Sequence, residues 1–226
     1  MISELDFHRE KRTGIPELIL AERKGFKEIV SCVDEYTKKN GRAIVTRANR
    51  KIRKHIKKIF EKKHNVEIYD DARICIVKKK GYKIKRNHGI VAVLSAGASD
   101  FGVAEEARII AEELGCNVIK KYDVGVAGIH RVINALKNMD RADAYVVVAG
   151  REGALPTVVS GLVSAPVIGV PASTGYGYGG KGKSALYAML QSCAPIAVVN
   201  IDAGVIAGAL AASIARNVGR YRGKFE

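Results

Sequence analysis

The sequence has no tryptophan, and its 226 residues include only five prolines and four cysteines. The cysteines (Cys32, Cys75, Cys116 and Cys193) lie far apart and form no C-x-x-C pair, which argues against a disulfide framework or a zinc site. No run of eighteen apolar residues is present, and the opening MISELDFHREKR lacks the apolar segment of a secretion signal. We therefore expect a cytoplasmic protein with no membrane partner and reduced thiols.

Charge is distributed unevenly along the chain. Residues 1–88 carry 25 Lys and Arg against 12 Asp and Glu, whereas residues 89–226 carry 13 against 11. The first part therefore has a net charge of +13, and the second, rich in Gly, Ala and Val, has +2. This shift predicts two domains, a small basic N-terminal α/β domain over residues 1–86 and a larger catalytic domain over residues 87–226.

Within the basic part, apolar spacing predicts a helix over Lys24–Lys39 and a strand that begins at Ala43. Asn49 is placed to cap a second helix. Two further strands are expected around VEIY and RICIV. The inner face of the second helix is expected to consist of Ile52, Ile56, Ile59 and Phe60.

The second helix of the basic part, RKIRKHIKKIFEKKH, raises the possibility of nucleic-acid binding. No aromatic residues alternate with its lysines to stack on bases, so a solvated helix face is the simpler interpretation and a nucleic-acid partner is not expected. The same positive field would also favour a small anionic substrate.

Strands and helices alternate regularly from residue 89 onward. Apolar runs such as GIVAVLS and AYVVVAG have the composition of strands covered on both faces, and each is followed by a helical pattern. Five such units in succession predict a parallel, doubly wound α/β sheet of the flavodoxin-like, purine-carboxylase type.

Ligands of such sheets bind at the carboxyl ends of the strands, where this sequence places glycine-rich loops. Ser99 and Asp100 either contact a ribose or phosphate or cap the helix that follows. His130 is a candidate proton shuttle or phosphate donor and Arg131 a phosphate clamp, unless both are ordinary polar residues of a first helical turn. The candidate substrate-binding residues are Ser95, Gly97, Ser99, Asp100, His130, Arg131, Gly150, Arg151, Gly153, Ser173, Gly175 and Gly177.

The stretch GYGGKGKS from Gly177 to Ser184 matches the phosphate-binding loop pattern G-x-x-x-x-G-K-[ST]. A working loop of this kind follows directly from a buried strand, whereas here PVIGVP ends about six residues earlier. Asp202 could be the acidic residue that accompanies such a loop in nucleotide-binding proteins, but its position is equally consistent with a helix cap. We therefore expect no ATPase or GTPase site.

Three stretches of the second part, DVGVAGIHR, AGREGALPTVVSGLVSAPVIGVP and QSCAPIAVVNIDAG, resemble the pyridinium-3,5-biscarboxylic acid mononucleotide synthases. These enzymes make an intermediate of the nickel-pincer nucleotide, the lactate racemase cofactor, and are related to the carboxylases that act on aminoimidazole ribonucleotide. The resemblance covers residues 89–218 and extends loosely to HREKRTGIPELILAERK near the N-terminus.

The resemblance implies a carboxylase that is also a hydrolase. Its substrates are nicotinic acid adenine dinucleotide and CO2, and it releases AMP without an organic cofactor. The family's nucleophile falls on Cys193, whose thiolate adds to the pyridinium ring, and the acid/base carboxylate falls on Glu152. From the residues alone, Cys193 would be a buried small side chain and Glu152 either a helix cap or a catalytic group.

The predicted topology separates these two residues, because Cys193 precedes a strand and Glu152 follows one. We therefore expect a homo-oligomer in which one subunit supplies Cys193 to the site of another, with the small-residue helix AGALAASIA available for close packing between subunits. Mg²⁺ is a possible companion of the phosphates, but no metal-ligating residues stand out. The alternatives are an aminoimidazole ribonucleotide carboxylase or mutase, and a nucleotide- or RNA-binding protein without catalysis.

Overall fold

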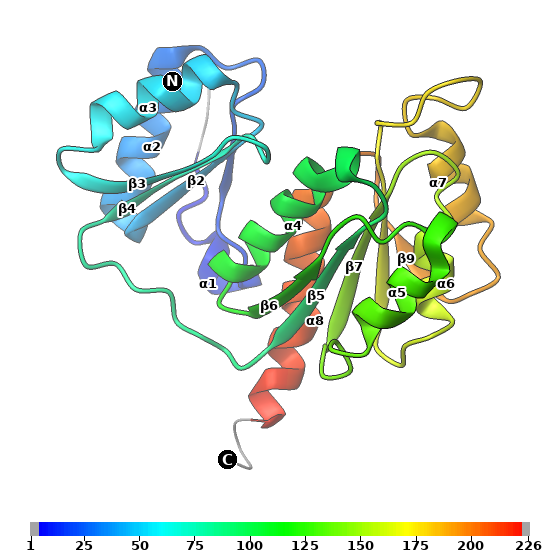
Figure 1. Ribbon diagram of the computed structural model, residues 1–226. Helices are drawn as coiled ribbons and strands as arrows, with labels where there is room; N and C mark the ends of the chain where they lie inside the picture. The colour runs from blue at the N-terminus through cyan, green and yellow to red at the C-terminus, as the bar shows by residue number, and fades with distance from the viewer. Residues whose placement is uncertain (1–4, 223–226) are drawn as a thin grey trace. The chain divides into compact units, whose positions relative to one another are not determined.

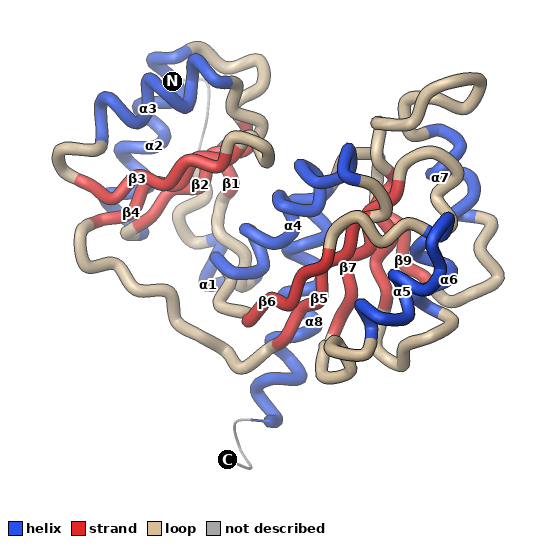
Figure 2. Tube along the Cα trace, in the orientation of Figure 1, coloured by secondary structure: helices blue, strands red, loops and turns tan. Residues whose placement is uncertain are grey.

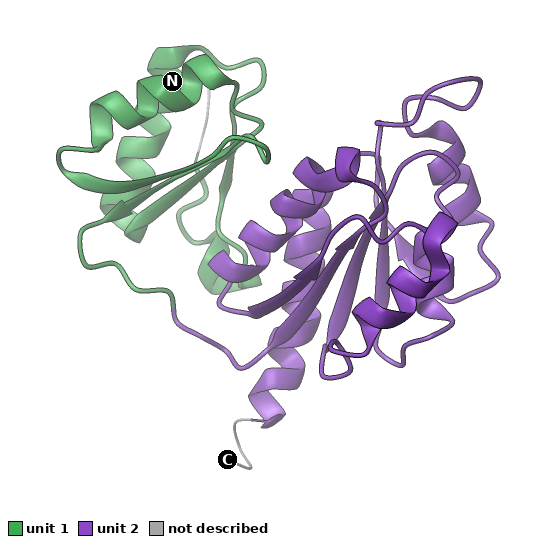
Figure 3. Cartoon of the chain, in the orientation of Figure 1, with its two compact units in different colours: residues 1–84 green, residues 85–226 purple. Residues whose placement is uncertain are grey.

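The computed structural model describes residues 5–222 and divides the chain into two compact units, residues 1–84 and 85–226 (Figures 1 and 3). The expected boundary after residue 86 lies two residues beyond this division. Among the described residues, no helix is both long and apolar enough to cross a membrane.

Unit 1 is a four-stranded mixed sheet in the order β1-β2-β4-β3, with β1 parallel to β2 and β4 antiparallel to its neighbours. The two expected helices and three expected strands are present, and two short elements, α1 and β1, were not anticipated. The elements are α1 (Arg9–Thr13), β1 (Leu18–Leu20), α2 (Phe26–Asn40), β2 (Arg42–Thr46), α3 (Arg50–Phe60), β3 (His64–Tyr69) and β4 (Ile74–Lys79).

The start of α3 follows from its cap. The side chain of Asn49 accepts a hydrogen bond from the backbone N–H of Ile52 (3.0 Å), as its position before the helix predicts. Ile52, Ile56 and Phe60 face the core. The prediction that Ile59 belongs to the same face is wrong, because Ile59 is 43% exposed. It follows Ile56 by three residues, and the wide lysine-rich face of this helix leaves only a narrow apolar stripe.

Unit 2 is an all-parallel five-stranded sheet in the order β6-β5-β7-β8-β9. In order of their appearance in the sequence the strands are therefore arranged 2-1-3-4-5, the flavodoxin-like order, which confirms the expected fold class. The strands are β5 (Ile90–Ser95), β6 (Asn117–Lys121), β7 (Ala144–Ala149), β8 (Val167–Pro171) and β9 (Ile196–Val198). The helices are α4 (Phe101–Glu113), α5 (Ile129–Leu136), α6 (Leu155–Ser160), α7 (Lys183–Leu190) and α8 (Gly204–Arg222).

Helices cover both faces of this sheet (Figure 2). Alanines of α4 and α8 pack on one face with the inner side chains of β5, β7 and β8, and residues of α5, α6 and α7 pack on the other. The central strand β7 is buried along its whole length, which explains its uninterrupted apolar sequence.

The small residues of α8 are used inside the unit. A Cβ on Gly208 would lie 2.4 Å from the carbonyl oxygen of Ala107 in α4, and Ala207, Ala211 and Ala215 are fully buried. The expectation that AGALAASIA packs between subunits is therefore wrong for these buried positions. Leu210 in this stretch and Ile206 just before it are exposed instead.

Candidate functional site at the carboxyl edge of the sheet

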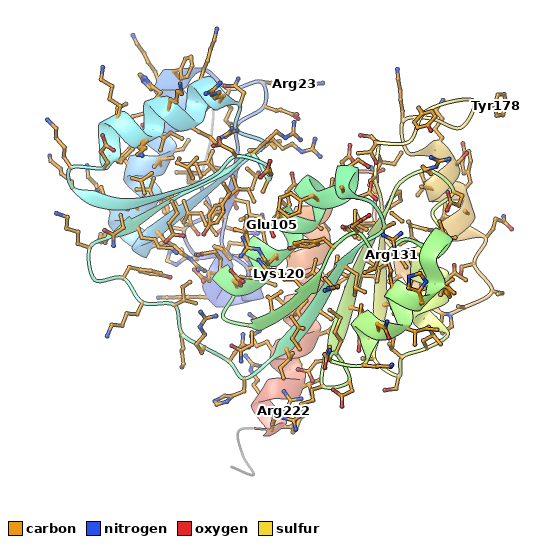
Figure 4. The ribbon with its side chains drawn as sticks, in the orientation of Figure 1. Arg23, Glu105, Lys120, Arg131, Tyr178 and Arg222 are labelled. Atoms are coloured by element: carbon orange, nitrogen blue, oxygen red, sulfur yellow. The ribbon has the colours of Figure 1, made fainter. Side chains whose placement is uncertain are left out.

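The glycine-rich loops of unit 2 meet at one edge of its sheet. The parallel ladder places Ser95, at the end of β5, beside Val148 of β7, and Ala149 beside Pro171 at the end of β8. The loops that follow these strands are therefore neighbours, as the topology predicts. Figure 4 labels two side chains of this region, Arg131 in the first turn of α5 and Tyr178 in the loop after β8.

A buried carboxylate joins two of the loops. Asp100 is 3% exposed; its Oδ2 accepts the backbone N–H of Gly97 (2.9 Å), and its Oδ1 accepts the hydroxyl of Thr174 (2.6 Å). The first bond closes the turn after β5, and the Asp100 side chain makes no capping bond to α4, so the expectation that it caps that helix is wrong. The second ties that turn to the loop after β8, across the loop that follows β7. Asp100 therefore has a structural role at the centre of the candidate site.

Gly150, in the loop after β7, lies against this pair. A Cβ at this position would be 2.5 Å from Oγ1 of Thr174 and 3.1 Å from Oδ1 of Asp100. The glycine allows the three loops to approach one another closely. Gly97 and Ser99 lie in the loop after β5, with Ser99 exposed at its surface.

Two further hydrogen-bond sets fix the loops. The hydroxyl of Ser95, which is fully buried, donates to the carbonyl of Gly97 (3.3 Å) and accepts the N–H of Asp123 (3.3 Å). Asp202 accepts the backbone N–H of Ser173 (2.8 Å), which ties the last loop to the loop after β8. Ser95 and Asp202 therefore connect loops to one another.

Arg151 and Glu152 form the exposed rim of the site. Arg151 donates to the hydroxyl of Tyr176 (3.2 Å), and its guanidinium lies 5.3 Å from the centre of that ring. Nε of Arg151 is 3.9 Å from Oε2 of Glu152, whose side chain is 63% exposed. Glu152 is thus accessible to a molecule bound at this edge, while Gly153 beside it is buried.

Four of the eight residues other than glycine that have positive φ in the described part of the chain lie in these loops, the fourth being Lys181. Asp123, Arg151 and Asp202 have φ values of 57°, 50° and 54°, in the left-handed region that side-chain-bearing residues seldom adopt. One such residue lies in each of the loops after β6, β7 and β9. Strain of this kind is frequent at ligand-binding loops.

His130 and Arg131 begin α5 beside the end of β6. His130 is exposed, and Arg131 donates through Nη1 to the carbonyl oxygen of Asp123 (2.8 Å) and to its Oδ2 (3.2 Å). Arg131 is therefore held by the preceding loop, with part of its side chain still accessible for an anionic group.

The loop over residues 172–182 projects from the edge and carries the exposed side chains of Tyr176 and Tyr178. Gly175 lies near the backbone of Arg151, whereas Gly177 stands in open space with a φ of +82°. β8 ends at Pro171 and α7 begins only at Lys183. The GYGGKGKS stretch therefore does not follow directly from a strand, in contrast to a phosphate-binding loop.

Cys193 lies at the opposite edge of the sheet. It is in the loop between α7 and β9, and α7 spans about 12 Å of rise for its eight residues. The loop is anchored to α6: Thr157 donates to Ser192 (2.8 Å), and Ser160 donates to the carbonyl of Pro195 (3.0 Å). Within one chain, Cys193 and Glu152 are thus on opposite edges.

Exposure distinguishes Cys193 from the other thiols. Cys32, Cys75 and Cys116 are buried, and Cys193 is exposed. Burial raises the pKa of the thiols of Cys32 and Cys116, and it raises the pKa of Cys75 to about 12. The thiolate is the reactive form, so the three buried cysteines are poor nucleophiles.

The part of the chain that the structure describes contains no group of three or more His, Cys, Asp or Glu side chains placed to hold a metal ion. Any cation at this edge would need ligands from a bound molecule, such as the oxygens of phosphate groups.

Thr174 was not among the residues selected from the sequence, although its neighbours Ser173 and Gly175 were. Its role depends on a contact with Asp100, 74 positions away, that only the fold creates. Asp123 and Tyr176 were also missed. The left-handed backbone of Asp123 has no strong signal in a single sequence.

Removing the carboxylate of Asp100 is expected to destabilise unit 2. Asp100→Ala leaves the N–H of Gly97 and the hydroxyl of Thr174 without their acceptor, a loss of about 1–3 kcal/mol. Urea unfolding of this variant should show a lower midpoint than wild type. Asp123→Asn, a change at an exposed carboxylate, is the matched control and should unfold like wild type. Equal midpoints for all three proteins would contradict the structural role of Asp100.

A parallel doubly wound domain with strained, polar loops at its carboxyl edge belongs to the class of open α/β proteins that bind ligands at that edge. Within this class, the chain belongs to the AIR carboxylase family, whose model matches residues 90–220. A second model, described as the LarB/PurE-like N-terminal domain, matches residues 1–80. Membership of this family indicates an enzyme of the carboxylase or mutase type.

Several individual proteins are similar to this chain. An uncharacterised protein of Methanocaldococcus jannaschii is 44% identical over 206 residues, which cover 89% of this chain and 79% of the relative. The N5-carboxyaminoimidazole ribonucleotide mutase of the same organism is 31% identical over 120 residues, covering 51% of this chain and 71% of the relative. The crystal structure of Treponema denticola PurE is 20% identical and covers 59% of this chain and 87% of that one, with a TM-score of 0.46.

Proposed function

We propose that this protein carboxylates the pyridinium ring of nicotinic acid adenine dinucleotide and hydrolyses its phosphoanhydride, releasing AMP, as a step towards the nickel-pincer nucleotide. The observation that carries the proposal is the exposed thiol of Cys193 on an anchored loop, in a chain whose other three thiols are buried. An aminoimidazole ring is electron-rich and attacks CO2 without a nucleophilic catalyst, whereas a pyridinium ring is electron-poor and needs one.

In the proposed reaction, the Cys193 thiolate adds to the ring carbon para to the nitrogen, which converts the pyridinium into a dihydropyridine. The adjacent enamine carbon then forms a bond to CO2. Glu152 removes the proton from that carbon, and the thiolate leaves as aromaticity returns. Separately, water cleaves the bond between the two phosphates. The sum consumes one dinucleotide, one CO2 and one water.

The proposal requires two subunits for each site. Glu152 lies at the carboxyl edge of the sheet and Cys193 at the amino edge, so one chain cannot supply both to one ring. The amino edge is suited to contact with another subunit, because Leu162 and Leu190 are exposed there, beside a concavity of about 440 Å³ lined by Val163, Pro195 and Ile196. We therefore propose a homo-oligomer whose active sites combine residues of neighbouring chains.

The experiment is incubation with nicotinic acid adenine dinucleotide, Mg²⁺ and isotopically labelled bicarbonate, followed by mass spectrometry. AMP and a mononucleotide with one labelled additional carboxylate are the expected products. Mg²⁺ is included because it neutralises phosphate oxygens, and its omission is a separate arm of the assay.

A mutase or carboxylase of aminoimidazole ribonucleotide is the second candidate. Identities of 36% over 122 residues and 31% over 120 residues to such mutases favour it. A parallel incubation with that ribonucleotide decides between the two. Turnover of the ribonucleotide without any reaction of the dinucleotide would refute the first proposal.

A further inference from the structure

A groove of about 470 Å³ runs beside β6, the edge strand of the unit 2 sheet. One wall is formed by the end of β6 and the loop after it, and the other by α5 and the turn that follows. The volume is in the range of small-molecule sites. The groove reaches the candidate site, because Asp123 and Arg131 belong to both.

The base of the groove is apolar. Val124 and Met139 are each 2% exposed, and Ile119 and Ala135 complete this surface. α5 is only eight residues long, so it covers the inner strands while leaving the side of β6 open. An apolar base beside polar walls is suited to a planar heterocyclic ring.

The helical wall of the groove carries three polar side chains on one side of the helix. Arg131, Asn134 and Asn138 lie three and four residues apart, a spacing that brings them to the same side of α5 and its final turn. Lys137 donates to Oδ1 of Asn134 (3.2 Å), which leaves the amide nitrogen of Asn134 for a ligand. A carboxamide offers donors and an acceptor together, as the edge of a nucleobase does.

The charge of the groove favours an anion. Lys121 and Arg131 line it, against the single carboxylate of Asp123. Lys120 is also a lining residue, but its ammonium lies on the α4 side of β6, 5.9 Å from the centre of the Tyr122 ring. The side chain of Tyr122 lies on the α4 side of the strand, where its hydroxyl bonds to Glu105 and its ring packs against Phe101, so it adds no charge or donor to the groove. Figure 4 shows Lys120 and Glu105 near each other on that side and Arg131 on the α5 side.

We propose that this groove binds the adenylate half of the substrate, an inference that rests on the dinucleotide function proposed above. Arg131 lies where the groove meets the site and contacts the diphosphate. Asn134 and Asn138 bind the adenine edge above Ala135 and Met139, and Lys121 adds positive charge. After hydrolysis, AMP occupies the groove as a product. A mononucleotide substrate would leave it empty, so the groove favours dinucleotides.

The test is calorimetric titration of the full-length protein with AMP. Asn138→Ala removes a hydrogen-bonding side chain from the groove and should weaken AMP binding about tenfold. Asn117→Ala is the matched control. Asn117 is an exposed asparagine at the start of β6, the strand that borders the groove, and it lies outside the groove. It should bind AMP like wild type. Nicotinic acid mononucleotide should bind equally to all three proteins.

The groove assignment is overturned if wild type does not bind AMP at millimolar concentration, or if Asn138→Ala and Asn117→Ala bind it equally. Either result stands whatever the carboxylation assay shows. A different outcome separates the two proposals. If AMP binding depends on Asn138 but the protein does not carboxylate the dinucleotide, the proposed reaction is overturned and the adenylate site remains.

Discussion

Cys193→Ala is expected to lower the rate of dinucleotide carboxylation at least about 1,000-fold, because loss of a covalent nucleophile removes the intermediate through which the reaction proceeds. Without the sulfur adduct, the pyridinium ring has no electron-rich carbon to attack CO2. The measurement is incorporation of labelled bicarbonate into the nucleotide under conditions in which wild type turns over many times.

Two further variants show whether the loss is chemical. Cys193→Ser keeps the size and polarity of the side chain but replaces a good nucleophile and leaving group with a poor one, so it should be as inactive as Cys193→Ala. Cys116→Ala removes a fully buried thiol from the same unit and should retain wild-type chemistry. A Cys193→Ala protein that carboxylates the dinucleotide at the wild-type rate would exclude the adduct. Turnover of aminoimidazole ribonucleotide by that variant would favour the mutase.

The fold of unit 2 could be anticipated because its signals are local and strong. Apolar runs such as AYVVVA fill the buried strand β7, and the alternation with amphipathic helices leaves few topologies. Unit 1 was harder. Its strand β1 has only three residues, and a segment of that length is defined by pairing with β2 rather than by its own pattern. The error at Ile59 has the same origin, since apolar character alone does not say how wide the buried stripe is.

The candidate site was anticipated only in outline. Topology indicates which loops share an edge, and so the sequence could suggest Asp100 and Glu152 as neighbours of bound substrate. It could not show that Asp100 is bonded to Thr174 or that Ser95 is buried between two loops, because these depend on side-chain positions in three dimensions. The groove beside β6 was also missed, since Asn134 and Asn138 look like ordinary exposed residues of a short helix.

The separation of Cys193 from Glu152 leads to a second large effect. Cys193→Ala and Glu152→Ala are each expected to be inactive alone, but a co-expressed mixture should recover activity. In a mixed pair, one site combines the intact glutamate of the first chain with the intact cysteine of the second, and the other site lacks both. Random pairing at equal amounts therefore restores about a quarter of wild-type sites.

The dependence of the recovered activity on the ratio of the two variants makes this test specific. If f is the fraction of chains that carry Cys193→Ala, the number of intact sites follows f(1 − f) and is greatest for equal amounts. Mixing Cys193→Ala with Cys193→Ser is the control and should recover nothing, because no pair then contains the thiol. Mixed oligomers that stay as inactive as their parents would show that both residues act within one chain. The loop between α7 and β9 would then have to bring Cys193 across the sheet, and the thiol chemistry would need a different partner from Glu152.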